Sequence, residues 1–398
     1  MLKFFSYLLC LLFGYSSTNN ASLCQDPFFK LHHRKCIEIH HMMEKMLVGR
    51  RLRQLVSAAL DRGIISPKID LSADMIHSPY WGRKFRDFFG KHWSTMMNRA
   101  FPGLTPLVGF DLLSKVPVYI ASFVGRRKRR RKKGSRDDGS AVYARNVLSA
   151  IKFLRSCGIT VRCFVADRAF TSVDLLGHLA KRIVAKWYIL PLKSNSKLRK
   201  RITDVTEWFK DGKGNLVGMV RGVDYNGVKG NLIVLRIRRK KHWKRKKTKR
   251  LTLLYLTNYN DDNPVEILKR YRRRGSHEGF FGRLSCMGFH QKPGNNKKQI
   301  NAHFFLCISL ELLLHELRED LDFGPIGIKS FSALLQKRGL VWYEKFSDGR
   351  KKKRLNTIML VNRSFIRKIG RTTIETPNMR IRLIEDRGRI DLSSLGAN

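Results

Sequence analysis

The sequence predicts an α/β protein in which a central sheet is flanked by helices, interrupted by a basic β-rich insertion and preceded by an N-terminal helical domain. Two observations support this fold class. Apolar residues follow helical spacing up to about residue 66, and strand candidates then alternate with helices. A stretch rich in Lys, Arg and Gly separates two sets of these strands. We therefore divide the chain into residues 1–66, 67–192, 193–250, 251–330 and 331–398.

Residues 1–66 have the spacing of an N-terminal helical domain. Apolar residues recur at helical intervals from Ile37 to Leu60, and Gly63 ends the last helix. The apolar run from Phe4 to Phe13 resembles a signal peptide, but we interpret it as a buried helix of this domain. A run of about a dozen residues is too short to span a bilayer. Because this small helical unit is also basic, it either binds DNA or caps the rest of the fold.

Residues 67–192 predict the first part of a sheet. KIDLSADMI alternates as strands do, and LVGFDLL and VPVYIASFV are further strand candidates. A helix should follow, because Ala144, Val147, Leu148, Ile151 and Leu154 share one helical face and Gly158 ends it. The apolar run ITVRCFVA is typical of a strand buried on both faces, and it ends at Asp167. A helix from about Ser172 to Ala185 then leads to the strand KWYILPL. This strand–helix–strand order indicates a right-handed parallel crossover.

Residues 193–250 predict the basic β-rich insertion, with the strands LVGMVRGV and GNLIVLRIR. The core resumes over residues 251–330 with the strand LTLLYLTN, and Asn263-Pro264 begins a helix. A further helix carries Glu278, and residues 303–317 form a long apolar helix. Residues 331–398 are basic and mixed, and we assign them no role.

The charge balance indicates a polyanionic partner. The chain has 80 Lys and Arg against 31 Asp and Glu, a formal net charge of +49. Neutralising phosphates releases condensed counterions, so we expect the chain to bind nucleic acid. A membrane surface is the alternative partner. The seven cysteines are odd in number and form no C-x-x-C pair, which fits a reducing compartment. We predict a cytoplasmic, nucleoid-associated protein that does not bind membranes.

Asp167 is the first candidate for chemistry. It follows a buried strand, and sites in such sheets form at the carboxyl ends of parallel strands. Hard divalent cations take oxygen ligands, so converging carboxylates can hold the metals that assist phosphodiester cleavage. The alternative is that Asp167 caps the segment that follows.

Two segments resemble a known family. VADRAF, residues 165–170, is similar to the D-R-x-F/Y segment of DDE-type insertion-sequence transposases. Tyr271, Arg274 and Glu278 have the spacing of the group named for its Y-R-E-K residues, and Asp74 in DMIHSPYWG resembles the first acid of related transposases. The match covers about residues 67–317. It implies an RNase H-like core with a mixed sheet, which cleaves transposon ends and transfers strands into target DNA.

The resemblance also implies partners and residue roles. It implies double-stranded DNA as substrate, a homodimer or higher oligomer, and two Mg²⁺ or Mn²⁺ ions. The residues to which it gives roles are Asp74, Asp167 and Glu278 as catalytic metal ligands, and Tyr271, Arg274, Arg168 and Arg283 as DNA contacts.

Several points stay open from the sequence. Asp70 and Asp111 are alternatives for the first acid, and Arg274 could instead form a surface salt bridge. The lysine of the motif falls on Ser285, and Arg283, two residues before it, points elsewhere on a helix. The rival functions are an RNase H-like nuclease without joining activity and a catalytically decayed DNA-binding protein.

Overall fold

The computed structural model describes residues 33–79, 91–94, 99–124, 140–238, 250–260, 263–286, 289, 297–320, 340–345, 354–360, 373–376 and 379–384. The run from Phe4 to Phe13, which we expect to be a buried helix, lies outside them. The chain forms two compact units: residues 40–282 with 292–308, and residues 1–39 with 283–291 and 309–398. The domain divisions drawn from the sequence stay predictions.

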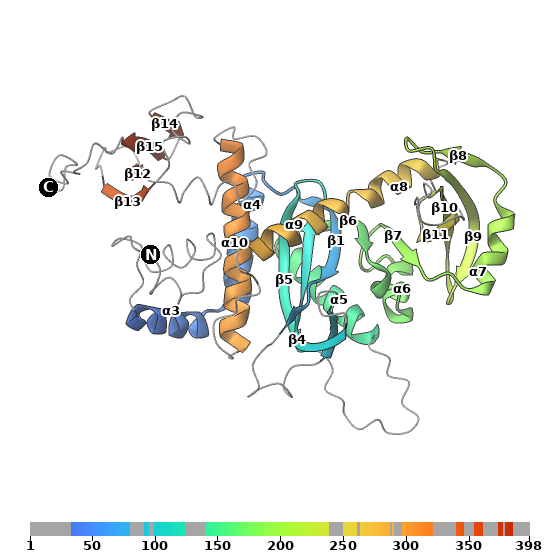
Figure 1. Cartoon of the computed structure of the whole chain (residues 1–398), viewed down its shortest axis with the longest axis horizontal. Coiled ribbons are helices and arrows are strands. Elements are labelled where there is room, and N and C mark those ends of the chain that lie inside the picture. Colours follow the sequence, from blue (N-terminus) through green and yellow to red (C-terminus); the bar gives the residue numbers. More distant parts are fainter. Residues whose placement is uncertain are drawn as a thin grey trace, which may run out of the picture. The chain divides into compact units, whose positions relative to one another are not determined.

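The larger unit is built on one mixed sheet (Figure 1). Its described strands are β1 (Lys68–Met75), β2 (Ser78–Pro79), β3 (Lys91–Ser94), β4 (Arg99–Asp111), β5 (Val116–Val124), β6 (Thr160–Ala166), β7 (Trp187–Leu192), β8 (Trp208–Lys210), β9 (Leu216–Tyr225), β10 (Val228–Arg238) and β11 (Arg250–Thr257). The strand order is β2-β4-β1-β6-β7-β11-β10-β9-β8, and β3 and β5 both pair with β4. β6 is parallel to β1 and β7, whereas β1 is antiparallel to β4 and β7 is antiparallel to β11. The predicted α/β class with a mixed sheet is therefore confirmed.

The predicted parallel crossover joins β6 to β7 through α6 (Val173–Ala180). Ser172 caps this helix, because its side-chain oxygen accepts a hydrogen bond from the Leu175 N–H at 3.2 Å. The helix ends at Ala180, so the predicted end at Ala185 is wrong. Arg182 has a φ of 54°, a left-handed conformation that cannot continue the helix.

Helix α5 (Ser140–Ser156) precedes β6 and buries one face. The buried residues lie at helical spacing, as the sequence predicts: Ala144, Val147, Ile151 and Leu154. Gly158 follows with a φ of 79°, which the lack of a Cβ permits. This helix places Tyr143 near the carboxyl ends of the parallel strands.

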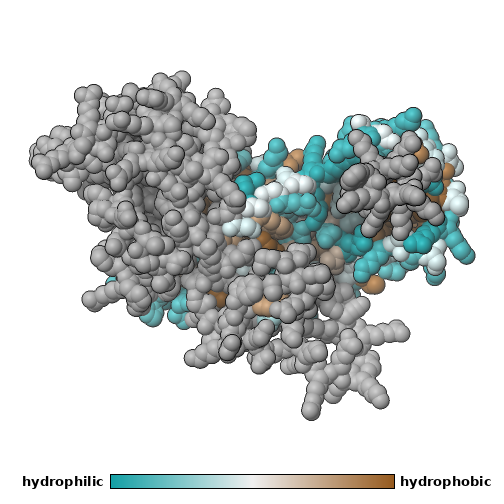
Figure 2. All heavy atoms as spheres, viewed as in Figure 1, coloured by the Kyte–Doolittle hydropathy of each residue, from teal (hydrophilic) through white to brown (hydrophobic). Residues whose placement is uncertain are grey.

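The insertion continues the central sheet. It contains α7 (Ser196–Arg201), the short η2 (Ile202–Asp204) and β8 to β10. Asn226 and Gly227 both have positive φ angles, which suits the tight turn between β9 and β10. Both predicted strands of the insertion are confirmed, and β10 pairs with β11 along its length. The described residues of this region that are visible in Figure 2 are mostly hydrophilic.

The remaining helices include α3 (His33–Lys45), α4 (Val48–Asp61), α8 (Pro264–Arg272), α9 (Gly275–Cys286) and α10 (Lys297–Asp320). α3 and α4 confirm the helical spacing between residues 37 and 60. α8 begins after Asn263, as predicted, and the Asn263 side chain accepts a hydrogen bond from the Val265 N–H at 3.0 Å. α10 is longer than the expected 303–317. None of the helices in the described part of the chain is both long and apolar enough to cross a bilayer.

The C-terminal region contains a small sheet of its own. Its described strands are β12 (Leu340–Lys345), β13 (Arg354–Leu360), β14 (Thr373–Thr376) and β15 (Met379–Ile384). They pair antiparallel in the order β13-β12-β15-β14. The sequence had suggested no structure or role for this region.

Candidate active site

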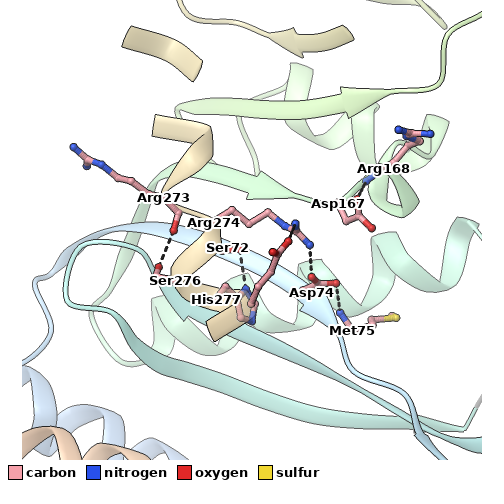
Figure 3. Close-up of polar contacts among 10 residues, drawn as sticks. Ser72, Asp74, Met75, Asp167, Arg168, Arg273, Arg274, Ser276 and His277 are labelled. Carbon is pink, nitrogen blue, oxygen red and sulfur yellow. Dashed lines mark hydrogen bonds and ion pairs between the residues drawn. The ribbon is translucent and has the colours of Figure 1, made fainter. Parts of the chain in front are cut away.

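Asp74 and Asp167 lie side by side at the carboxyl ends of two parallel strands. β1 and β6 pair with Ala73 opposite Ala166, and an aspartate follows on each strand. Neighbouring strands are about 4.8 Å apart. Figure 3 shows the two side chains close together. Asp167 also caps the short helix η1 (Arg168–Phe170), because one of its oxygens accepts a hydrogen bond from the Arg168 N–H at 2.6 Å. Asp167 therefore acts as the cap that the alternative interpretation proposed. Its side chain is exposed, and its second carboxylate oxygen is left for other contacts.

Glu278 reaches this edge of the sheet through Arg274. Arg274 lies in the turn between α8 and α9, and Glu278 lies in the first turn of α9. The guanidinium donates to Glu278 Oε1 at 2.6 Å through one nitrogen and to Asp74 Oδ2 through another. Asp74 and Arg274 are largely buried, with 16% and 12% of their side chains exposed, whereas Glu278 is 64% exposed. The arginine thus joins two of the three predicted acids.

A buried hydrogen bond holds α9 against the sheet. His277, the neighbour of Glu278, shares a 2.8 Å hydrogen bond between its Nδ1 and the hydroxyl of Ser72 on β1. Its ring stacks on Phe110 of β4, with centroids 5.0 Å apart and planes 9° apart. Both His277 and Ser72 are fully buried. Because Ser72 lies two residues before Asp74, this contact sets the position of Glu278 relative to Asp74.

Burial governs the protonation of this region. Burial raises the pKa of Asp74, the Arg274 guanidinium opposes that rise, and the nearby Asp167 carboxylate adds to it. The pKa of Tyr143 is also raised, by burial first and then by the charges of Asp167 and Asp74. Tyr143 of α5 therefore borders the same site. The pKa of Tyr271 is raised mainly by burial.

The alternative first acids have other partners. Asp70 is buried and accepts two hydrogen bonds from Arg162, at 2.9 and 2.8 Å. The pairing of β1 with β6 shifts register between Ile69 and Asp70. Asp111 is the buried last residue of β4, and it accepts hydrogen bonds from the Leu113 and Ser114 N–H groups of the following turn at 3.1 Å. Of these three acids, Asp74 is the one that lies beside Asp167, because the residues before them, Ala73 and Ala166, are paired.

The predicted DNA-contact residues are dispersed. Tyr271 on α8 is half-buried and packs edge-on against Tyr255, with ring centroids 4.8 Å apart. Arg168 is exposed, and Figure 3 shows its side chain directed away from Asp74. Arg283 pairs with the buried carboxylate of Glu311. Ser285 is exposed on α9.

Sequence reasoning missed three residues of this site. Ser72, Tyr143 and His277 are ordinary in type, and neither Ser72 nor Tyr143 belongs to a motif that marks chemistry. His277 had a signal, because it stands directly before Glu278 within the resembling segment. The contacts that make these residues important join elements that lie far apart in the sequence.

The donor set fits a hard divalent cation by chemistry. Asp74, Asp167 and Glu278 offer carboxylate oxygens, the ligands that Mg²⁺ and Mn²⁺ prefer. As they stand, however, no group of three or more His, Cys, Asp or Glu side chains within the described residues could hold a metal ion. The Arg274 guanidinium takes up one oxygen each of Asp74 and Glu278.

Comparison with known proteins finds no family model and no curated protein that matches the chain. Among solved structures, the chain is similar to one described as a cryo-EM structure of a piggyBac transposase synaptic complex with hairpin DNA. The sequences are 14% identical and the TM-score is 0.46. The similarity covers 83% of this chain and 69% of that chain.

Proposed function

We propose that the chain is a DDE-type DNA transposase with an RNase H-like core, in which Asp74, Asp167 and Glu278 are the catalytic carboxylates. The observation that carries the proposal is the placement of these acids. Two end adjacent parallel strands, and the third is tied to the first through Arg274. The sequence resemblance named the same three residues. A purely structural network would not require two aspartates at neighbouring strand ends, where like charges repel.

The three carboxylates would hold two Mg²⁺ or Mn²⁺ ions. Bound there, such ions activate a water molecule and stabilise the leaving oxygen of a phosphodiester. The chain itself orients the carboxylates, with Asp74 and Asp167 fixed by the β1–β6 pairing and Glu278 by the contact between His277 and Ser72. Tyr271, Arg168, Arg274 and Arg283 contact DNA phosphates in this proposal.

The reaction has two steps on double-stranded DNA. Water attacks the phosphodiester at a transposon end, the 3′ oxygen leaves with a proton, and a 3′ hydroxyl results. That hydroxyl then attacks a phosphodiester of the target, so one P–O bond forms and one breaks. The net charge of +49 provides the attraction for both DNA partners. Pairing two ends calls for a homodimer or a higher oligomer, and we place the protein in the cytoplasm with the nucleoid.

The test uses the purified protein and a DNA fragment that includes the sequences flanking its coding region. We expect cleavage in Mg²⁺ or Mn²⁺, and joining of precut ends to a plasmid. Asp167→Asn should abolish cleavage while leaving DNA binding in a mobility-shift assay intact. Asp174→Asn removes an exposed aspartate on the nearby helix α6 and serves as the matched control. Cleavage that is unchanged in Asp167→Asn would overturn the catalytic assignment.

Two other functions give different results in the same assay. A nuclease of this fold cleaves in either metal but joins no precut end. A decayed DNA-binding protein binds DNA without cleaving it, and its affinity is unchanged by a metal chelator. Two observations favour the decayed protein as the second candidate: Arg274 pairs with two of the acids, and Ser285 replaces the lysine of the motif.

A further inference from the structure

Arg274 is held by two carboxylates in a largely buried position. Its side chain is 12% exposed, and its two terminal nitrogens donate to Asp74 Oδ2 and Glu278 Oε1. Its Nε is buried and has no hydrogen-bond partner among the described residues. A guanidinium that formed only a surface ion pair would lie in water, where such pairs contribute little to stability. This arginine instead lies inside the cluster of acids.

The acids need a counter-charge when no metal is bound. Asp74 and Asp167 stand at neighbouring positions of adjacent strands, and the charges of Asp74, Asp167 and Glu278 all stabilise the protonated form of Arg274. The largely buried Asp74 carboxylate and the neighbouring Asp167 carboxylate repel each other when nothing neutralises them. Arg274 supplies one positive charge at this point. A lysine would have to reach both carboxylates from a single nitrogen, whereas Arg274 uses two separate nitrogens of its planar guanidinium.

We propose that Arg274 is the resident counter-cation of the carboxylate site and competes with the divalent metal for Asp74 and Glu278. This inference rests on the proposed function. Asp74 Oδ1 accepts a hydrogen bond from the Met75 N–H at 2.7 Å, and Asp74 Oδ2 accepts one from Arg274, so both oxygens of this carboxylate have donors. A metal ion that bound Asp74 and Glu278 would compete with Arg274 for these carboxylates and would bring a second positive charge beside the guanidinium. Metal binding would therefore favour the release of Arg274 from at least one carboxylate.

This competition has two consequences for the metal-free protein. Arg274 keeps the acids together before metal arrives, so the apo protein is more stable with it than without it. It also lowers the apparent metal affinity, because part of the binding free energy is used to displace the guanidinium. Removing Arg274 should thus lower apo stability and tighten metal binding. A residue with a purely structural role would lower stability without tightening metal binding.

The experiment measures Mn²⁺ binding to the full-length protein without DNA, from the loss of the electron paramagnetic resonance signal of free Mn²⁺. Arg274→Gln should bind Mn²⁺ on the order of tenfold more tightly than the wild type, within the usual range for two coupled ligands. The melting temperature of Arg274→Gln should be lower in chelator and should rise further on adding Mn²⁺. Arg274→Lys, which keeps the charge, should bind with intermediate affinity and covers the case in which the glutamine variant does not fold.

Two further variants define the outcome. Arg273→Gln is the matched control, because Arg273 is exposed and Figure 3 shows it directed away from Asp74; its Mn²⁺ affinity should equal that of the wild type. Asp74→Asn should remove the binding that belongs to this site. Equal affinity in the wild type, Arg274→Gln and Arg274→Lys would overturn the competition while leaving the metal site in place. If Asp74→Asn binds Mn²⁺ as the wild type does, no binding depends on Asp74. That result would overturn the competition and, separately, the metal dependence of the proposed function.

Discussion

His277 should make the stability of the protein depend on pH between about 3 and 6.5. Burial lowers the pKa of His277 from 6.5 to about 3, and the Arg274 charge adds to this effect. The imidazole therefore stays neutral in the folded protein over a range in which it is protonated in the unfolded chain. In that range the unfolded state binds more protons, so stability falls as the pH falls. Above pH 6.5 both states are neutral and the contribution is constant.

The size of the effect follows from the two pKa values. Between pH 7 and pH 5, the linkage relation gives a loss of about 2 kcal/mol in the free energy of unfolding from this one group. Full burial of the ring and its hydrogen bond to Ser72 leave no solvent to moderate the effect.

The measurement compares urea unfolding of the wild type and His277→Asn at pH 7 and pH 5, followed by tryptophan fluorescence. Asparagine can still hydrogen-bond to Ser72 but does not titrate, so the variant should be less stable at pH 7 and lose about 2 kcal/mol less on acidification. His178→Asn, on the partly exposed face of α6, should keep the wild-type pH dependence. An equal loss in the wild type and His277→Asn would refute the reasoning, because other groups would then account for the whole pH effect.

Two further predictions concern the residues around the site. Asp70→Asn should destabilise the protein by about 1–3 kcal/mol in thermal unfolding, because it weakens the ion pair that the buried Asp70 carboxylate makes with Arg162. It should leave Mn²⁺ binding and DNA cleavage intact, and loss of cleavage in a folded Asp70→Asn protein would make Asp70 the first acid. Asn263→Ala should lower the free energy of unfolding by about 1 kcal/mol, because α8 loses its N-terminal cap, whereas Asn263→Asp should retain most of the stability because aspartate can also cap. Equal destabilisation by both changes would show that the cap contributes little.

Local patterns predicted most of the described elements of the core. The apolar run before Asp167 became β6, the spacing from Ala144 to Leu154 became the buried face of α5, and Asn263-Pro264 began α8. These features depend on side-chain periodicity and on chain-terminating residues, which are local properties. The end of α6 was misjudged because apolar residues continue to Ala185, whereas the backbone turns at Arg182. Apolar character predicts burial there, but not helix.

The sequence by itself determined the class of the fold, the net charge of +49 and three candidate acids in chain order. It could not determine which side chains neutralise those acids, because that depends on contacts between residues about 200 positions apart. The pairing of Arg274 with Asp74 and of His277 with Ser72 exists only once α9 packs on β1. Burial then decides their chemistry, since it makes the histidine neutral and places the guanidinium among the carboxylates. The tertiary structure thus shows that Arg274 pairs with two of the acids, whereas its expected contact with DNA stays a prediction.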